Sequence, residues 1–255
     1  MIGQLIGMVH LGPLPGAPGF GGSMSSLIEA AIDDAATLAA AGFDALLVEN
    51  FGDAPFYADD VPDATVAAMA RAAAAVAGAV DLPLGINVLR NDGLAAVSIA
   101  AAVGASFVRV NVLTGTMTTD QGPIVGKAAE IARLRASLRQ DIAIAADVMV
   151  KHAVPPPGLT LAAAARDTWE RGGADALVIS GDSTGQPVSR ADLEALRHNV
   201  PDAPLLIGSG VSAATVAGLL EIADGVIVGT SIKTGAVTTA AVDPGLAAAL
   251  TAAAR

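Results

Sequence analysis

Short apolar segments alternate with longer, alanine-rich segments along the whole chain. Each short segment ends in a polar or glycine-rich stretch, and each longer segment carries its apolar positions at helical spacing. The predicted strands cover residues 5–9, 45–48, 84–88, 107–112, 142–148, 176–179, 205–207 and 225–228. The predicted helices cover residues 25–41, 63–80, 93–103, 126–139, 160–171, 190–198, 213–221 and 244–254. Strands that alternate with helices of this length indicate βαβ units and a parallel sheet.

This alternation predicts an α/β fold with a single (β/α)8 TIM barrel. The 255 residues fit the typical barrel length of about 250, and no linker divides the chain, so we expect one domain over residues 1–255. An open, doubly wound sheet is the alternative fold. The long loops at 10–24, 49–62 and 112–126 all follow predicted strands. On a barrel they would lie on one face, where active sites are found.

Composition narrows the classes of function. The chain is 53% hydrophobic and 3% aromatic and has no cysteine, which excludes disulfides, thiolate nucleophiles and cysteine metal sites. Its formal charge of −11, from 14 Lys+Arg and 25 Asp+Glu, argues against a nucleic-acid partner, which requires a basic surface. Without a basic, apolar leader or an apolar run of about 18 residues, we expect a cytoplasmic protein with no integral membrane segment.

Two glycine-rich turns predict a phosphate site. Residues 205–211 read LLIGSGV and residues 225–233 read GVIVGTSIK, so the last two predicted strands both end in glycine and hydroxyl residues. Glycine lets backbone N–H groups approach a phosphate to about 2.8 Å, and the loops after strands seven and eight often form such a site. The expected phosphate-binding residues are Gly208, Ser209, Gly210, Gly229, Thr230 and Ser231. Alternatively, the glycines only form tight turns; Lys233 adds a charge to the site or is solvated.

Carboxylates and a lysine at other strand ends are candidate catalytic residues. Glu49 ends an apolar strand, where it could act as a general base or metal ligand, or form an ion pair inside the barrel. Asp147 lies close in sequence to Lys151, which allows an acid–base role, a metal role or an interior Asp–Lys pair. Lys151 could form a Schiff base if it is desolvated.

Further polar side chains lie at strand ends. His10 is either catalytic or a hydrogen-bonded structural residue. Asn111 and Asn87 suit sugar hydroxyls or an enediolate oxygen, and Asp182 follows the sixth predicted strand as a substrate-binding candidate. The three histidines are too widely spaced for a metal signature, although His10, Glu49 and Asp147 could converge in space. We therefore assign no metal ligands and no definite cofactor, while a divalent metal stays possible.

The same segments resemble the BtpA/SgcQ family. The shared motifs are MVHLGPLPG at 8–16, VENFGDAPF at 48–56, VRVNV at 108–112, TDQG at 119–122, ADVMVKH at 146–152, IGSGV at 207–211 and VIVGTSIK at 226–233. They extend over most of the chain, in order. One departure is SGDSTG at 180–185, where the family pattern has a threonine in place of the first serine, so the hydroxyl is kept.

The resemblance implies a barrel of the ribulose-phosphate-binding type. Some members of the family are named as photosystem I biogenesis factors, and others are placed among sugar-metabolism proteins. The resemblance also implies a set of site positions: His10, Glu49, Asn50, Asp53, Asn87, Arg109, Asn111, Asp120, Gln121, Asp147, Lys151 and His152.

Residues and resemblance together predict an enzyme that acts on a phosphorylated sugar or similar small phosphometabolite. Glu49 or Asp147 would shift a proton beside a carbonyl, as in isomerases, epimerases and aldolases, with His10, Lys151 and Asn111 as further catalytic residues. The alternative is a non-catalytic assembly factor for a photosynthetic membrane complex, photosystem I; a third possibility is a barrel that only senses a metabolite. The alanine-rich, weakly charged helices suggest a homo-oligomer.

Overall fold

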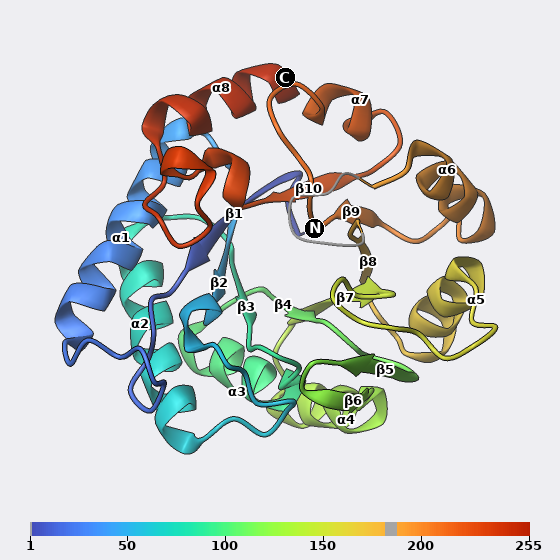
Figure 1. Ribbon diagram of the computed structural model, residues 1–255, viewed down its shortest axis with the longest axis horizontal. Coiled ribbons are helices and arrows are strands. Elements are labelled where there is room, and N and C mark those ends of the chain that lie inside the picture. The colour runs from blue at the N-terminus through green and yellow to red at the C-terminus, as the bar shows by residue number, and fades with distance from the viewer. Residues whose placement is uncertain (1, 182–187) are drawn as a thin grey trace.

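The computed structural model describes residues 2–181 and 188–255, and in this part of the chain eight parallel strands close into a barrel (Figure 1). The strands are β1 (Leu5–His10), β2 (Ala45–Glu49), β3 (Leu84–Asn87), β4 (Phe107–Val110), β7 (Ala143–Val148), β8 (Ala176–Ile179), β9 (Leu205–Ile207) and β10 (Gly225–Val228). Their hydrogen-bonded order is β1-β10-β9-β8-β7-β4-β3-β2, and β1 pairs with both β2 and β10. The predicted TIM barrel is therefore confirmed and the open sheet is excluded.

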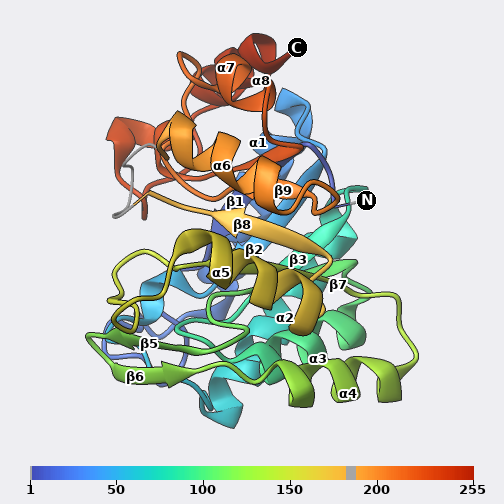
Figure 2. The ribbon, with the colours of Figure 1, turned by 90° about the vertical axis from the view of Figure 1, so that its right-hand side faces the viewer.

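Helices cover the outside of the barrel (Figure 2). They are α1 (Met24–Ala41), α2 (Asp63–Ala79), α3 (Gly93–Val103), α4 (Ala128–Leu138), α5 (Leu161–Arg166), α6 (Arg190–Asn199), α7 (Val216–Leu220) and α8 (Pro244–Ala254). Short turns complete the set: the π-helical η2 (Asp167–Arg171) and the 3-10 turns η1 (Phe51–Asp53), η3 (Thr230–Ile232) and η4 (Thr234–Ala236). No helix in the described part is long and apolar enough to span a bilayer.

Local signals set the ends of these elements. The Oγ of Ser23 accepts a hydrogen bond from the Ser26 N–H and caps α1, which ends at Gly42 in the left-handed conformation, with φ of 88°. The predicted helix at 213–221 shortens to Val216–Leu220, because residues 212–215 form a turn in which the Ser212 N–H donates to Thr215 Oγ1.

A β-hairpin lies inside the predicted loop at 112–126. Strands β5 (Thr116–Thr119) and β6 (Gly122–Val125) pair antiparallel around Asp120 and Gln121. A bridge between Thr118 and Val154 attaches the hairpin to the segment after β7, with N···O distances of 3.0 and 2.8 Å. Because Met117 is the only apolar residue of the first strand, hydrophobic alternation did not reveal the hairpin.

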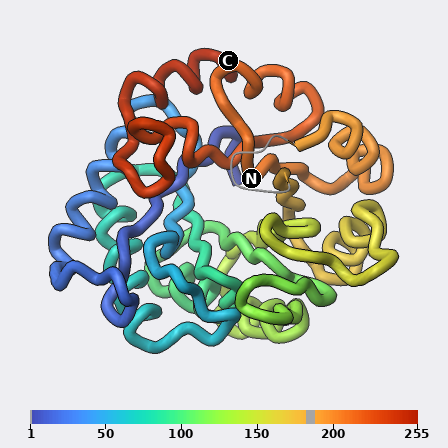
Figure 3. Tube along the Cα trace, in the orientation of Figure 1, coloured from blue at the N-terminus to red at the C-terminus, as the bar shows by residue number. Residues whose placement is uncertain are grey.

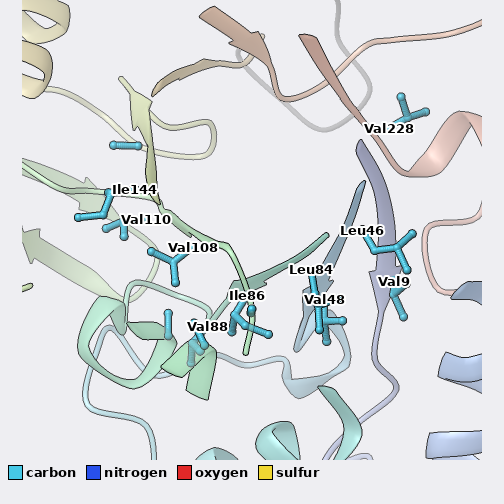
Figure 4. Close-up of a cluster of buried hydrophobic side chains, with 14 of the residues drawn as sticks. Val9, Leu46, Val48, Leu84, Ile86, Val88, Val108, Val110, Ile144 and Val228 are labelled. Carbon is cyan, nitrogen blue, oxygen red and sulfur yellow. The ribbon is translucent and has the colours of Figure 1, made fainter. Parts of the chain in front are cut away.

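Alternation along each barrel strand divides the core into two parts. One set of side chains points outward and packs against the helices; Figure 4 labels Val9, Val48, Ile86, Val108 and Ile144 among them. The other set fills the barrel and includes Ile6, Met8, Leu47, Phe107, Ala145, Val178, Leu206 and Ile227. The largest of these is Phe107, and its ring occupies the space beside Gly85, where a Cβ would lie 2.2 Å from it.

The same alternation brings polar residues to the carboxyl end of the barrel. In the strand register His10 lies beside Glu49, Glu49 beside Asn87, and Asn87 beside Arg109. These positions continue the inward-pointing series of their strands, two residues beyond Met8, Leu47, Gly85 and Phe107. The barrel interior is therefore apolar at one end and polar at the end where the long loops lie.

Candidate active site

A cavity of about 480 Å³ opens at the carboxyl ends of β9, β10 and β1. It is lined by all six predicted phosphate-binding residues, and also by His10, Glu49, Arg109, Lys151, Ser212, Thr215 and Thr238. The two glycine-rich turns, which the sequence separates by some twenty residues, thus face one common space. We call this space the glycine cavity.

Four backbone N–H groups around the glycine cavity make no hydrogen bond within the described chain: those of Gly210, Gly229, Thr230 and Ser231. Free N–H groups at a glycine-rich turn can bind an anion. Gly208 differs from the prediction, because its N–H donates to the Ile179 carbonyl at 2.7 Å. Its contribution is space, since a Cβ there would lie 2.7 Å from both Ser180 Oγ and Val178 Cγ1.

Hydroxyl groups add donors to the glycine cavity. The Ser231 Oγ is buried and has no hydrogen-bond partner among the described residues. Thr230 Oγ1 lies 2.9 Å from Thr238 Oγ1, and Ser209 Oγ accepts the Gly181 N–H at 3.0 Å. Ser212, Thr215 and Thr238 also line this cavity but were not predicted. They lie several residues beyond the ends of β9 and β10, and the strand pattern indicates only residues directly at a strand end.

Lys233 lies outside the glycine cavity, and both interpretations of it were wrong. Its side chain is completely buried, and its Nζ pairs with Asp34 Oδ2 of α1. The other carboxylate oxygen of Asp34 accepts the Val242 N–H at 2.7 Å. The burial of Asp34 could have been predicted, because it falls on the buried stripe of α1 formed by Ala31, Ala35 and Leu38, but this spacing does not identify its partner.

A second cavity, of about 450 Å³, shares Glu49, Phe51, Arg109 and Lys151 with the first. We call it the cation cavity, because its other lining residues include Arg90 and His152, together with Phe56, Leu89, Asn111, Asp120 and Gln121. The turn of the β5–β6 hairpin contributes Asp120 and Gln121 to this cavity; Figure 1 labels the two strands of the hairpin. Glu49 and Lys151 thus lie where the two cavities meet.

Asp147 is bound by Arg109 rather than by Lys151. The Arg109 Nε and Nη2 donate to the two Asp147 oxygens at 2.8 and 2.9 Å, and the Asn111 Nδ2 donates to Oδ2 at 3.1 Å. Asn87 Nδ2 in turn donates to Asn111 Oδ1 at 3.0 Å. Burial lowers the pKa of Arg109, but the charge and hydrogen bonds of Asp147 outweigh it and raise that pKa above its ordinary value. An interior ion pair is present, therefore, but with a different cation from the one expected.

Glu49 has a very different environment. The residue is 6% exposed, and no described residue donates a hydrogen bond to its carboxylate. The Nε2 atom of His10 lies 3.7 Å from its Oε1. Burial raises the pKa of Glu49, and the nearby positive charges of Arg109 and Lys151 reduce this effect. The carboxyl group therefore keeps its proton to higher pH than an exposed glutamate.

Lys151 and His10 both lose basicity. Burial, reinforced by the charge of Arg109, lowers the pKa of Lys151, and no carboxylate of the described chain lies within 4 Å of its Nζ. Burial and then the charges of Lys233 and Lys151 lower the pKa of His10 from 6.5 to about 3. His10 is therefore neutral at pH 7. Its ring packs against Phe51, with centroids 5.0 Å apart.

Comparison with known proteins assigns the family. The BtpA family matches residues 1–255. The chain belongs to the BtpA family. Within the stretches that align, it is 54% identical to a protein of Thermococcus kodakarensis over 231 residues, covering 90% of this chain and 86% of that one. It is 47% identical to the photosystem I biogenesis protein BtpA of Synechocystis over 240 residues, covering 94% and 84% of the two chains.

More distant relatives extend the comparison. The sgc region protein SgcQ of Escherichia coli is 31% identical over 232 residues, covering 90% of this chain and 85% of SgcQ. Among solved structures, phosphoribosyl anthranilate isomerase of Thermus thermophilus has a TM-score of 0.60 at 12% identity, covering 98% of both chains. Tryptophan synthase of M. tuberculosis has a TM-score of 0.63 at 21% identity, covering 99% of this chain and 93% of that one. At these identities the structures share the barrel fold with this BtpA family chain.

The positions implied by the BtpA family include residues that face the cavities and residues that join loops. Glu49, Arg109 and Lys151 face both cavities. Asn50 and Asp53 instead join loops: Asn50 Oδ1 accepts the Leu89 N–H at 2.7 Å, Asn50 Nδ2 donates to Asp53 Oδ2 at 3.0 Å, and Asp53 Oδ1 accepts the Leu14 N–H at 2.8 Å. They therefore fix the loops that frame the site of this BtpA chain.

One predicted site residue, Asp182, lies outside the described part of the chain, and some residues that line the BtpA site were missed. Arg109 was found only through the family, although it faces the same way as Asn111, two residues along its strand, and this spacing could have revealed it. Phe51 was not predicted. Across residues 2–181 and 188–255, no three His, Asp or Glu side chains form a group that could hold a metal ion; His10 and Glu49 approach each other, while Asp147 is bound by Arg109.

Proposed function

We propose that this protein is an enzyme that binds a phosphorylated sugar or similar phosphometabolite and moves a proton beside a carbonyl group. One observation carries the proposal. Glu49 and Lys151, which have no ion-pair partner within 3.5 Å in the described chain, lie where the glycine cavity meets the cation cavity. A carboxylate and an amine in that position are suited to act on a substrate whose phosphate occupies the glycine cavity.

The phosphate would be held by backbone. The free N–H groups of Gly210, Gly229, Thr230 and Ser231 and the unpartnered Ser231 hydroxyl supply donors. Gly208 and Gly229 leave room, because a Cβ at Gly229 would lie 2.9 Å from the His10 ring. The likeness to phosphoribosyl anthranilate isomerase supports this half of the proposal, since the name of that enzyme specifies a phosphorylated substrate on the same fold.

Glu49 would be the general base. It would take a proton from the carbon beside the carbonyl, while the electron pair of the broken C–H bond moves to the carbonyl oxygen. The raised pKa makes the ionised carboxylate a stronger base than that of an exposed glutamate, which favours proton uptake. The Lys151 ammonium would stabilise the resulting enediolate oxygen. Its lowered pKa also allows the neutral amine to attack the carbonyl, which would lead to aldolase-type chemistry.

The remaining predicted site residues would position other side chains or assist Glu49. Asp147, bound by Arg109 and Asn111, would hold the Arg109 guanidinium at the boundary of the cavities rather than take a proton itself. Asn87 would orient Asn111 through their hydrogen bond of 3.0 Å. His10, neutral at pH 7, would donate or accept a hydrogen bond beside Glu49.

Phosphate binding can be tested by thermal unfolding. Inorganic phosphate or ribulose 5-phosphate should raise the melting temperature, because a ligand of the folded state stabilises it. Ser231→Asp should abolish this increase by placing a negative charge among the donors, whereas Ser98→Asp, on the exposed side of α3, should retain it. An increase that persists in Ser231→Asp would contradict a phosphate site at these turns.

A second function is favoured by a relative at 47% identity, which is named a photosystem I biogenesis protein. The two proposals can be separated in a Synechocystis strain that lacks this relative. If the unmodified chain restores photosystem I there and Glu49→Gln does so equally well, the role in assembly does not depend on the proposed chemistry. If only the unmodified chain restores it, the enzyme proposal is supported.

A further inference from the structure

The cation cavity contains two positive side chains, the buried guanidinium of Arg90 and the partly buried ammonium of Lys151, and the chemistry proposed at Glu49 uses only Lys151. Arg90 follows β3, is 7% exposed, and its Nη2 donates to the Lys151 carbonyl at 2.7 Å. Lys151 follows β7. The ion pairs of the described chain include neither residue, so no carboxylate among residues 2–181 and 188–255 lies within 4 Å of either cationic group.

The acidic residues nearby do not balance these charges. Asp147 forms two hydrogen bonds with Arg109 and one with Asn111. Asp120 is exposed on the turn of the β5–β6 hairpin, where Gln121 Nε2 donates to it. Glu49 is buried and forms no ion pair with Arg90 or Lys151 within 4 Å; its contact in that range is His10 Nε2, at 3.7 Å. Burial lowers the pKa of both Arg90 and Lys151, as expected for cations with no described carboxylate within 4 Å.

We propose that the cation cavity binds a second oxyanion of the substrate, so that the substrate carries an anionic group at each end. This inference rests on the proposed function, since it assumes that a phosphate occupies the glycine cavity. The two cavities meet at Glu49 and Lys151, so a molecule anchored in both would present its middle carbons to those residues. The substrate class is a sugar bisphosphate or a phosphorylated sugar acid.

The two halves of the site differ in a way that favours this arrangement. The glycine cavity offers backbone N–H groups and hydroxyls, whereas the cation cavity offers a guanidinium and an ammonium group. An oxyanion bound there would pair with both cationic groups, which have no described carboxylate within 4 Å, and charge-assisted hydrogen bonds are among the strongest that proteins form. Two fixed ends also allow only one orientation of the substrate, which selects the carbon that Glu49 deprotonates.

Matched pairs of ligands test the inference by calorimetry. Ribulose 1,5-bisphosphate and ribulose 5-phosphate differ by one phosphate; 6-phosphogluconate and sorbitol 6-phosphate differ by a carboxylate. In at least one pair, the ligand with two anionic groups should bind about tenfold tighter or more, the value of one charge-assisted hydrogen bond. The pair that shows the difference identifies the second group as phosphate or carboxylate.

Variants locate the second group. Arg90→Gln keeps a donor for the Lys151 carbonyl but removes the charge, so it should abolish the difference within the pair and leave the affinity for inorganic phosphate unchanged. Lys151→Gln should reduce the same difference, and Arg71→Gln, an exposed position on α2, should preserve it.

If phosphate binds but neither pair shows a difference, or if Arg90→Gln and Lys151→Gln both preserve it, the second subsite is overturned. If no ligand binds at all, the proposed function itself fails.

Discussion

At the scale of single residues, the site depends on one carboxyl group that the fold does not satisfy. Asp147 and Glu49 both occupy inward-pointing positions near the carboxyl ends of their strands. Asp147 receives three hydrogen bonds, from Arg109 and Asn111, whereas no described residue donates to Glu49. A buried and unsatisfied carboxyl group destabilises the folded chain when it is ionised, so its presence favours a functional interpretation.

Replacing this carboxyl should stabilise the protein at neutral pH. The folded-state pKa of Glu49 is raised, so the favourable burial of the neutral form is complete below the unfolded pKa of 4.5 and is lost as the pH rises through the folded value. Glu49→Gln stays neutral and avoids this loss. We expect a melting temperature above that of the unmodified protein at pH 7 and a difference that disappears toward pH 4, in a series of unfolding scans.

The size of the effect follows from the difference between the folded and unfolded pKa values. Each tenfold difference in proton affinity corresponds to about 1.4 kcal/mol, and each kcal/mol to roughly 2–4 °C in a chain of this length. Glu29→Gln, at an exposed position of α1, is the control and should show no such pH dependence. The same Glu49 variant should lose about 10²–10⁴-fold of any proton-transfer activity. Parallel pH profiles for Glu49→Gln and the unmodified protein would contradict a raised pKa.

At the scale of elements, the barrel strands could be predicted because each is a short apolar run with a polar or glycine end. The alternation also placed His10, Glu49, Asn87 and Asp147 at one end of the barrel. The β5–β6 hairpin could not be predicted in this way, since neither face of β5 is consistently apolar. Of the alternatives left open for Asp147, the interior pair with Lys151 was wrong, because proximity in sequence suggested Lys151 and the real partner, Arg109, comes from the neighbouring strand β4.

Packing between neighbouring strands makes a prediction at this scale. Gly85 on β3 faces the ring of Phe107 on β4, and a Cβ would lie 2.2 Å from it. Gly85→Ala should therefore destabilise the barrel by about 1–3 kcal/mol through overpacking. Phe107→Leu should recover part of this loss in the double variant. The measurement is urea unfolding of the single and double variants.

A glycine in open space provides the matched control. Gly78 lies on the exposed side of α2, with nothing within 4 Å of the position of a Cβ. Gly78→Ala should stabilise the chain by up to about 1 kcal/mol, because alanine favours the helix. If Gly85→Ala is as stable as the unmodified protein, the ring of Phe107 does not fill the barrel beside Gly85 as described.

At the scale of the whole molecule, the beginning and the end of the chain close the ring together. The tube in Figure 3 runs once around the barrel, so that its first and last segments meet. There β1 pairs with β10, the Thr251 Oγ1 donates to the Ala41 carbonyl at 2.8 Å, and Lys233 pairs with Asp34. Sequence analysis could not identify this last pair, because 199 residues separate its members and only the closed barrel brings them together.

The Lys233–Asp34 pair should be a major determinant of stability. Lys233→Met leaves the Asp34 carboxylate buried without its cation, and breaking such a pair costs about 3–5 kcal/mol. In the double variant Asp34→Asn/Lys233→Met both charges are removed, and the amide oxygen of the new asparagine can still accept the Val242 N–H, so most of the loss should be recovered. Arg190→Met, which breaks an exposed pair with Glu194, should change the free energy of unfolding by less than about 1 kcal/mol. Urea unfolding measures all three variants. Equal losses in Lys233→Met and in the double variant would show that Lys233 acts through packing, and the ion pair would then not be what holds the segment after β10 to α1.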